Sequence, residues 1–248
     1  MKLVSVILPY YKKIDFIKKT IKSILNQKYK NFEIILIYDD SNLGELDFLK
    51  KIEKKTNKIK LIINKKNLGP GLSRNKGILL SRGTYIAFCD ADDIWKKNKL
   101  NTQYNFMKKN NIKISHTSYN IIDSEDKIIG IRPAKKIQNY KDLISSCDIG
   151  LSSVMLKKEI LKNQKFPKLI TKEDYSLWLN LSKKYTIYGI NSNLVKWRKT
   201  EKSLSSNNVQ KLKDAFTIYY HQENCGFINS IIKVLVLSMN FLKKNIKT

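Results

Sequence analysis

The sequence is poor in cysteine, proline and glycine, with 3, 4 and 9 of them in 248 residues. Cys89, Cys147 and Cys225 lie far apart and form no CxxC or CxxH spacing, which argues against a structural zinc site and a disulfide framework. No stretch reaches the roughly 20 apolar residues that a membrane-spanning helix needs, and the apolar run at the start is too short for a signal peptide. These absences predict a cytoplasmic protein.

Acidic residues are also scarce, since 21 of them face 48 basic residues and leave a formal net charge of +27. Such a surplus predicts an anionic neighbour: nucleic acid, an anionic membrane or a phosphorylated substrate. Many of the lysines stand in doublets spread along the chain and form no single stripe, so no nucleic-acid partner is expected. An AT-rich genome, which favours Lys, Asn and Ile, is an alternative explanation for part of the excess.

The first 115 residues alternate between apolar strand patterns and helical periodicity, which predicts a parallel sheet with crossover helices. The strands are expected at 3–8, 32–38, 59–64 and 84–89, and the helices at 14–25, 45–55, from about 72, and at 98–109. The pattern changes after residue 112. There we expect a hairpin that turns at "DSEDK", a loop-rich region to about 171, an amphipathic helix at 172–185, short strands around 186–198 and helices at 207–223 and 227–244.

No Gly/Ser/Pro linker separates these parts, so they are expected to form one unit. The change of pattern near residue 115 divides this unit into a first half, 1–115, and a second half, 116–205, of the same domain. Residues 206–248 are expected to form C-terminal helices that contact a membrane surface or a second copy of the chain.

Polar groups follow each predicted strand of the first half: "PYY", "DDS", "NLGPG" and "DADD". Ligands of open α/β sheets bind at the carboxyl ends of the strands, where these groups converge. Asp90 and Asp92 lie two residues apart in an extended segment, so their carboxylates point the same way and repel unless a cation lies between them. Oxygen ligands of this kind suit Mn²⁺ or Mg²⁺ shared with a diphosphate. A solvated turn that caps the next helix is the alternative.

Further candidate side chains lie at other positions. Asp39 can accept a hydrogen bond from a base or a ribose, or can form an Asx turn. Arg74 lies in the first turn of a helix and can face a phosphate, although "NLGPGLSRNKG" is neither GxGxxG nor a P-loop and can be a plain strand-to-helix turn. Asp174, beside Glu173 at a helix start, can act as a general base, or its charge can merely interact favourably with the helix dipole. Trp178, one turn on, is expected to floor a sugar-sized pocket.

In order, the segments "VSVILPYY", "FEIILIYDDS", "NLGPGLSRNKGI", "GTYIAFCDADDIW" and "KEDYSLWLNL" resemble family 2 glycosyltransferases, over roughly residues 3–200. The resemblance implies an α/β protein with the GT-A fold, in which helices flank a Rossmann-like, mostly parallel sheet, followed here by a C-terminal helical extension. This chain departs from the family's "VDDGS" in having Tyr38 and Asp40. In "KWRKTEKSLS" it has Trp197 and Arg198 but no histidine at the expected place.

The resemblance also implies that residues 1–115 bind the nucleotide-sugar and that residues 116–205 of the same domain bind the acceptor and carry out catalysis. It implies roles for individual residues as well. A divalent metal is held by Asp92 and Asp90, the base is Asp174, and the acceptor is contacted by Glu173 and Trp178. The nucleotide-binding set is Pro9, Tyr11, Asp39, Arg74, Asp90 and Ala91.

The implied reaction is inverting transfer of a sugar from a nucleotide-sugar, with UDP the expected nucleotide, to a glycan or lipid-linked acceptor of lipopolysaccharide, lipooligosaccharide or capsule. The implied place is the cytoplasm, peripherally at the inner face of the inner membrane, where the apolar helix and the basic surplus can meet anionic lipid. The alternative is a metal-dependent nucleotidyltransferase acting on sugar phosphates. An Asp-x-Asp phosphatase of the haloacid dehalogenase type is excluded, because that motif belongs after the first strand.

Overall fold

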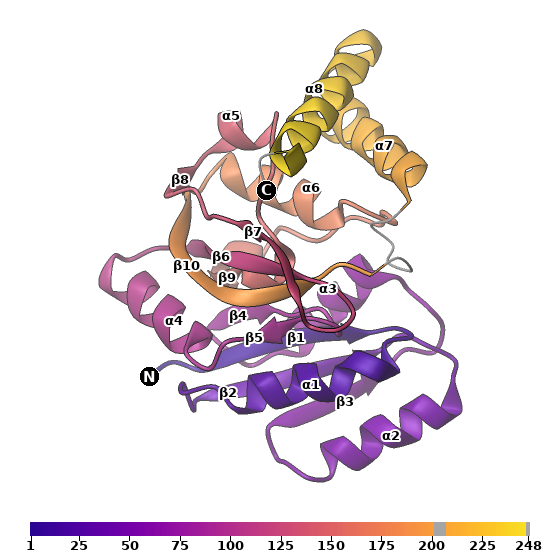
Figure 1. Cartoon of the computed structure of the whole chain (residues 1–248), viewed down its shortest axis with the longest axis vertical. Coiled ribbons are helices and arrows are strands. Elements are labelled where there is room, and N and C mark those ends of the chain that lie inside the picture. Colours follow the sequence, from indigo (N-terminus) through magenta and orange to yellow (C-terminus); the bar gives the residue numbers. More distant parts are fainter. Residues whose placement is uncertain (201–206, 247–248) are drawn as a thin grey trace.

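In the computed structural model, which describes residues 1–200 and 207–246, the strands form one ten-stranded sheet with helices on both faces (Figure 1). The strands are β1 (Val4–Tyr10), β2 (Phe32–Tyr38), β3 (Ile59–Ile63), β4 (Tyr85–Phe88), β5 (Ile94–Trp95), β6 (Ile114–Ile122), β7 (Ile128–Arg132), β8 (Ile137–Gln138), β9 (Met155–Lys157) and β10 (Ile187–Arg198). The helices are α1 (Ile14–Leu25), α2 (Leu43–Glu53), α3 (Pro70–Leu80), α4 (Lys99–Lys109), α5 (Tyr140–Leu143), α6 (Glu173–Ser182), α7 (Asn208–Thr217) and α8 (Phe227–Ile246), with short turns η1 (Leu151–Ser153) and η2 (Lys158–Leu161) and a π-helix η4 (Ile218–Gln222).

The first half forms the parallel part of the sheet, in the order β3-β2-β1-β4, as the strand pattern predicts. Every residue of β2 is buried, because alternate side chains enter two separate hydrophobic clusters. One cluster lies under α1, α2 and α4, and the other contains side chains of α6, α7 and α8. Burial on both faces explains why these strands read as continuous apolar runs.

The second half extends the same sheet through β9, which lies antiparallel between β4 and β6. This strand comes from the region expected to be loop-rich, so that expectation is wrong for residues 155–157. Three residues are too few to show a strand period in the sequence. The expected hairpin forms between β6 and β7. The expected short strands around 186–198 are one long strand, β10, which runs parallel to β6 with two register shifts.

Helix α6 is buried on almost every side, and the expectation of an amphipathic helix is therefore wrong. Besides Tyr175, Leu177, Trp178 and Leu181, the helix buries Leu179 together with two serines. The reason is its position: its cluster includes side chains from the sheet, such as Phe88, and from the C-terminal helices, such as Tyr219. Figure 1 shows α7 and α8 beyond α6, farthest from the parallel strands.

The C-terminal helices form as expected, with the π-helix η4 ending the first of them. Helix α8 rests on the domain mainly through Ser230, Val234 and Leu237, which are its buried residues. Within residues 1–200 and 207–246, none of the helices combines the length and the apolar character needed to cross a bilayer.

Candidate active site

The carboxyl ends of β1, β2 and β4 lie at the same end of the sheet, because β1 pairs in parallel with both β2 and β4. The residues that follow β1 contact the loops that follow the other two strands. The amide of Lys12 donates to Asp40 Oδ2 (3.2 Å), and Lys13 Nζ lies 2.7 Å from Asp92 Oδ2. The expected convergence of strand ends is therefore present in the structure.

The loop after β4, which we call the acidic loop (residues 90–93), presents three carboxylates in different surroundings. The side chain of Asp90 is about a third exposed, whereas Asp92 is mostly buried and ion-paired with Lys13. Burial raises the pKa of Asp92, although Lys13 opposes this shift. Asp93 is fully buried and accepts a hydrogen bond from the Arg198 amide (2.8 Å), and burial raises its pKa well above the usual value. Asp93 thus holds the loop in place, while Asp90 and Asp92 face the site.

Asp90 and Asp92, the carboxylates predicted to hold a divalent cation, each lie beside a cationic side chain, Arg74 and Lys13 respectively. Within the described residues, no group of three or more His, Cys, Asp or Glu side chains could hold a metal by itself. Asp92 already attracts the ammonium group of Lys13, so its position favours positive charge. Two carboxylates plus phosphate oxygens and water are the ligands that Mn²⁺ and Mg²⁺ accept in nucleotide sites.

Arg74 joins the two sides of the site. Its guanidinium lies 2.7 Å from Asp90 Oδ1 through Nη2 and 2.5 Å from Glu173 Oε1 through Nη1. The side chain is 5% exposed and lies over the ring of Phe166. Both of its terminal nitrogens bind carboxylates, so the residue bridges the loop after β4 to the start of α6, and its contact with a phosphate stays a prediction.

Glu173 and Asp174 begin α6, directly after Lys172, whose φ of +58° is unusual for a residue other than glycine. Asp174 is partly exposed, and its Oδ1 accepts a hydrogen bond from the amide of Tyr175 (2.7 Å). Burial raises the pKa of Asp174, with Arg74 acting in the opposite direction and Asp90 in the same direction. Burial also raises the pKa of Glu173 to about 7, against the attraction of Arg74.

A glycine allows α3 to approach α6 closely enough for this bridge. A Cβ on Gly71 would lie 2.8 Å from the Pro167 carbonyl oxygen and 3.2 Å from Glu173 Cγ. Both contacts are shorter than ordinary van der Waals distances, so any side chain at position 71 would push Arg74 away from Glu173.

The predicted nucleoside-binding residues lie at the same edge. Asp39 is buried, and its carboxylate accepts hydrogen bonds from Asn64 Nδ2 (2.8 Å) and from the amides of Leu68 (2.8 Å) and Gly69 (2.9 Å). Asp39 therefore shapes the loop before α3. A hydrogen bond from a base would have to use the acceptor positions of the carboxylate that these three hydrogen bonds leave unoccupied. Pro9 is partly exposed, and Tyr11 is exposed.

Trp178 does not line a pocket, and its predicted acceptor contact is corrected. The side chain is fully buried, with its ring 6.1 Å from that of Phe88 and 6.3 Å from that of Phe166. Its indole nitrogen finds no hydrogen-bond partner among the described residues. The turn of α6 after Asp174 faces the core, because the helix is covered on both sides.

Three residues that were not among the predicted site residues support the acidic loop. Lys13 pairs with Asp92, and Ser152 Oγ accepts a hydrogen bond from the Asp90 amide (2.9 Å). Arg198 is buried, donates from Nε to the Asp92 carbonyl (2.9 Å) and pairs with Asp126. Arg198 therefore holds the loop in place, and residues 201–206 of the segment that follows it lie outside the described residues.

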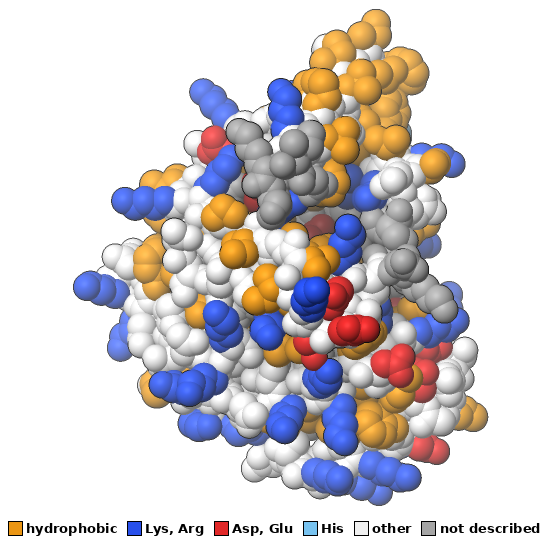
Figure 2. All heavy atoms as spheres, in the orientation of Figure 1, with side chains coloured by type: hydrophobic (Ala, Val, Ile, Leu, Met, Phe, Trp, Pro, Cys, Tyr) orange, Lys and Arg blue, Asp and Glu red, His pale blue; other side chains and the backbone are white. Residues whose placement is uncertain are grey.

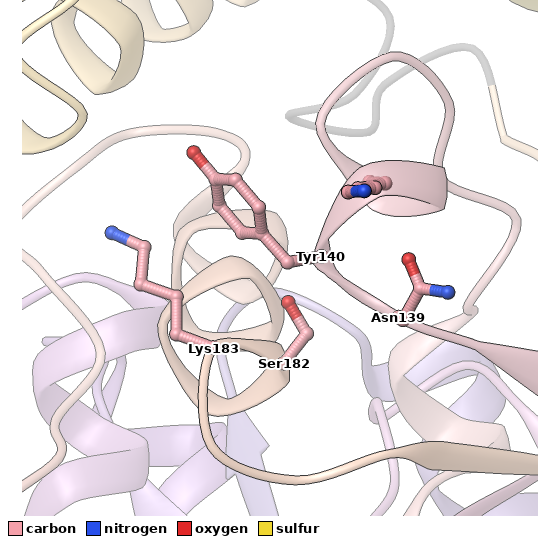
Figure 3. Close-up of a pocket in the computed structure, with 5 residues that line it drawn as sticks. Asn139, Tyr140, Ser182 and Lys183 are labelled. Atoms are coloured by element: carbon pink, nitrogen blue, oxygen red, sulfur yellow. The ribbon is translucent and has the colours of Figure 1, made fainter.

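The hollow drawn in Figure 3 is not this site. It is lined by Asn139, Tyr140 and Lys141 on one side and by Ser182 and Lys183 at the end of α6 on the other. It contains none of the strand-end residues, and its tyrosine donates a hydrogen bond to Glu223 (2.6 Å). We therefore place the candidate active site at Asp90, Asp92, Arg74, Glu173 and Asp174.

Comparison with known proteins identifies relatives of this chain. Residues 5–164 match the model of the family described as Glycosyl transferase family 2. The chain is 37% identical over 213 residues to the Escherichia coli UDP-Glc:alpha-D-GlcNAc-diphosphoundecaprenol beta-1,3-glucosyltransferase WfgD, covering 85% of this chain and 83% of that protein.

Solved structures share the fold at low sequence identity. S. aureus TarS (residues 1–349) in complex with UDP-GlcNAc aligns with a TM-score of 0.71 at 21% identity, over 89% of this chain and 66% of that one. The mannosyltransferase PcManGT of Pyrobaculum calidifontis, in complex with GDP-Man and Mn²⁺, aligns with a TM-score of 0.69 at 13% identity, over 94% of this chain and 68% of that one. These alignments confirm the predicted α/β architecture of the GT-A type.

Proposed function

The chain belongs to glycosyl transferase family 2 and is a glycosyltransferase, and we propose that it transfers a sugar with inversion from a nucleotide-sugar, UDP-sugar in particular, to an acceptor hydroxyl. The observation that carries this proposal is the Arg74 bridge, which joins the acidic loop to the start of α6 through two ion pairs. The bridge links the carboxylates proposed for the donor side to those proposed for the acceptor side. A nucleotidyltransferase, the alternative from sequence, is set aside by the family membership.

On the donor side, Asp90 and Asp92 would hold a divalent cation, Mn²⁺ or Mg²⁺. When bound, such an ion stabilises the negative charge that develops on a departing nucleoside diphosphate. Lys13 would stay close to that charge, since its Nζ already lies beside Asp92. Pro9, Tyr11 and the loop organised by Asp39 would receive the nucleoside, and the backbone at Ala91, whose carbonyl accepts from Thr20 (2.9 Å), keeps the acidic loop at the sheet edge.

On the acceptor side, Asp174 would take the proton of the attacking hydroxyl. It is the carboxylate of the α6 start that is partly exposed and has no ion pair among the described residues. Its raised pKa makes it a better proton acceptor near neutral pH than an ordinary aspartate. Glu173 would position Arg74, and through it the acidic loop, instead of contacting the acceptor itself. Attack from the face opposite the leaving group gives the inverted product.

The acceptor is proposed to be a glycan or lipid-linked intermediate of a bacterial surface polysaccharide, such as lipopolysaccharide, lipooligosaccharide or capsule. Support comes from WfgD, whose name gives a diphosphoundecaprenol-linked acceptor. An acceptor of this kind lies in a membrane, so the enzyme is proposed to work peripherally at the cytoplasmic face of the inner membrane.

The proposal is tested with a panel of nucleotide-sugars, Mn²⁺ and a GlcNAc-diphospho-lipid acceptor, scored by the nucleoside diphosphate released. One donor is expected to release it in an acceptor-dependent way. Asp92→Asn should lower that rate about 10³-fold or more, because the ion contributes several kcal/mol of charge stabilisation. Near wild-type turnover of the folded Asp92→Asn variant would contradict the metal assignment, and release of pyrophosphate would indicate nucleotidyl transfer instead.

A further inference from the structure

The outer side of α8 is apolar and, within the described part of the chain, largely uncovered. Figure 2 shows hydrophobic side chains gathered over this helix at one end of the molecule. Eight large apolar side chains of α8 are between 41% and 72% exposed: Phe227, Ile228, Ile231, Ile232, Leu235, Met239, Phe241 and Leu242. Single exposed apolar residues are normal on a protein surface, but a contiguous set of this size marks an interaction surface.

The surface continues onto α7 and η4. The ring of Phe216 stacks on Tyr220 at 5.5 Å and contacts the edge of Phe227 at 5.6 Å, so aromatic side chains join the two helices. Val209, Leu212 and Tyr220 are exposed as well. We call the exposed apolar residues of α7, η4 and α8 the C-terminal apolar face.

The charge around this face is positive. Between residues 207 and 243 the basic side chains are Lys211, Lys213, Lys233 and Lys243. The two acidic side chains of the same span are both engaged with the rest of the protein. Asp214 accepts hydrogen bonds from the amide and hydroxyl of Thr171, and Glu223 is paired with Lys183 (2.8 Å). Lysines around an apolar helix face suit a surface that is apolar inside and anionic outside.

We propose that the C-terminal apolar face docks in the plane of an anionic lipid bilayer. The helix is unsuited to crossing the membrane, so it would lie along the interface with its apolar side chains between the headgroups. A second copy of the chain is the less favourable occupant, because each copy carries a formal charge of +27 and would bring its own lysines to the contact. Anionic headgroups attract that same charge.

Docking would also orient the active site, a consequence that rests on the proposed function. The hydroxyl of Tyr219 in η4 lies 2.9 Å from that of Tyr175 in α6, and Ser176 donates a hydrogen bond to Gln222. The apolar face is therefore joined to the helix that begins with Glu173 and Asp174. The acceptor side of the site would be held at a fixed distance from the lipid surface, where a lipid-linked acceptor lies.

The experiment is vesicle flotation of the full chain with phosphatidylglycerol–phosphatidylcholine vesicles and with phosphatidylcholine vesicles alone. The wild-type protein should float with the anionic vesicles, and less so at high salt. The triple variant Ile228→Ser, Ile232→Ser, Leu235→Ser should bind at least about tenfold more weakly, because three exposed apolar side chains no longer enter the bilayer. The matched control Leu43→Ser, Ile63→Ser, Leu79→Ser replaces three exposed apolar residues elsewhere and should float as the wild type does.

Equal flotation of wild type and triple variant would overturn the proposal. So would a wild-type dimer that the triple variant abolishes, together with no vesicle binding, because the face would then belong to a second copy. Transfer to a soluble acceptor analogue without vesicles separates this inference from the proposed function. The triple variant should keep that activity, whereas absence of transfer in the wild type would count against the proposed function and leave the flotation result standing.

Discussion

The active site and the C-terminal apolar face depart in opposite ways from the usual distribution of residues between core and surface. At the active site, Arg74, Asp92, Asp93 and Glu173 are buried charged residues. On α8, large apolar side chains such as Ile228 and Leu235 are exposed. Buried charge is costly unless it is paired, and exposed apolar surface is costly unless something covers it.

The two regions differ in how far the chain itself pairs its buried charges and covers its exposed apolar side chains. At the site, Arg74 and Lys13 supply the compensating charge, and the structure is nearly complete without a ligand. At the apolar face, the described residues cover little, since eight large apolar side chains of α8 stay at least 41% exposed. The site is therefore organised before any ligand binds, whereas the apolar face depends on a partner. The following predictions test each half of this statement.

The largest effect is expected at Asp174, the site carboxylate without an ion pair among the described residues. Asp174→Asn should reduce sugar transfer about 10²- to 10⁴-fold, because the amide cannot accept the proton of the acceptor hydroxyl. Donor affinity should change little, since the acidic loop keeps both of its cation partners. Steady-state kinetics and calorimetry with the donor measure the two quantities. Retained transfer in the variant would place the base elsewhere.

The next effect is on stability and concerns the Arg74 bridge. Arg74→Met should lower the free energy of unfolding by about 3–5 kcal/mol, because it leaves Glu173 buried without its partner and removes the countercharge of Asp90. Urea denaturation followed by circular dichroism measures the change. Arg82→Met is the matched control: Arg82 pairs with Glu33 (2.9 Å) but is itself 77% exposed, so the loss should stay below about 1 kcal/mol. Equal losses in the two variants would contradict the special role of the bridge.

The Arg74 bridge also marks the limit of what the sequence could reveal. Residues 3–110 have long apolar runs and clear helical periods, so the parallel strands and their polar ends could be predicted, and with them Asp90 and Asp92 as candidates. Asp174 could be proposed from its position at the start of a predicted helix. The partners of Arg74 lie 16 and 99 positions away, and no local pattern encodes which carboxylates a buried arginine meets.

Other features were hidden for related reasons. Strand β9 is only three residues long and gains its place from its neighbours. The pairing of Lys13 with Asp92 could not be distinguished among so many lysines. Trp178 carries no local sign that α7 and η4 would close over its helix. Conversely, the exposure of α8 follows from its apolar composition only once the structure shows how few of its residues contact the domain.

A smaller effect concerns the pH dependence of stability. Burial raises the pKa of Glu173 to about 7, so between about pH 4.5 and 7 the folded protein retains a proton that the unfolded chain has released. The free energy of unfolding should therefore fall as the pH rises through this window. Glu173→Gln should make the decrease of the unfolding free energy with pH smaller. It should not abolish the decrease, because Asp92, Asp93 and Asp174 also have raised pKa values.

Urea titrations at pH 5, 6, 7 and 8 measure this slope. Glu159→Gln is a suitable control, since Glu159 is exposed and its partner Lys113 lowers its pKa. The control should leave the slope between pH 5 and 7 as it is in the wild type. A Glu173→Gln variant with the same slope as the wild type would show that Glu173 is ionised in the folded protein throughout the range.

The smallest change in the free energy of unfolding is expected on the apolar face, because side chains that are uncovered in solution contribute little to stability there. Ile232→Ser and Leu235→Ser should each change the free energy of unfolding in solution by no more than about 0.5 kcal/mol, because both side chains are more than half exposed. Leu237→Ala, on the buried side of the same helix, should cost about 2–5 kcal/mol. If either serine variant were as destabilising as Leu237→Ala, the face would already be covered in solution, and a lipid surface would no longer be needed to explain it.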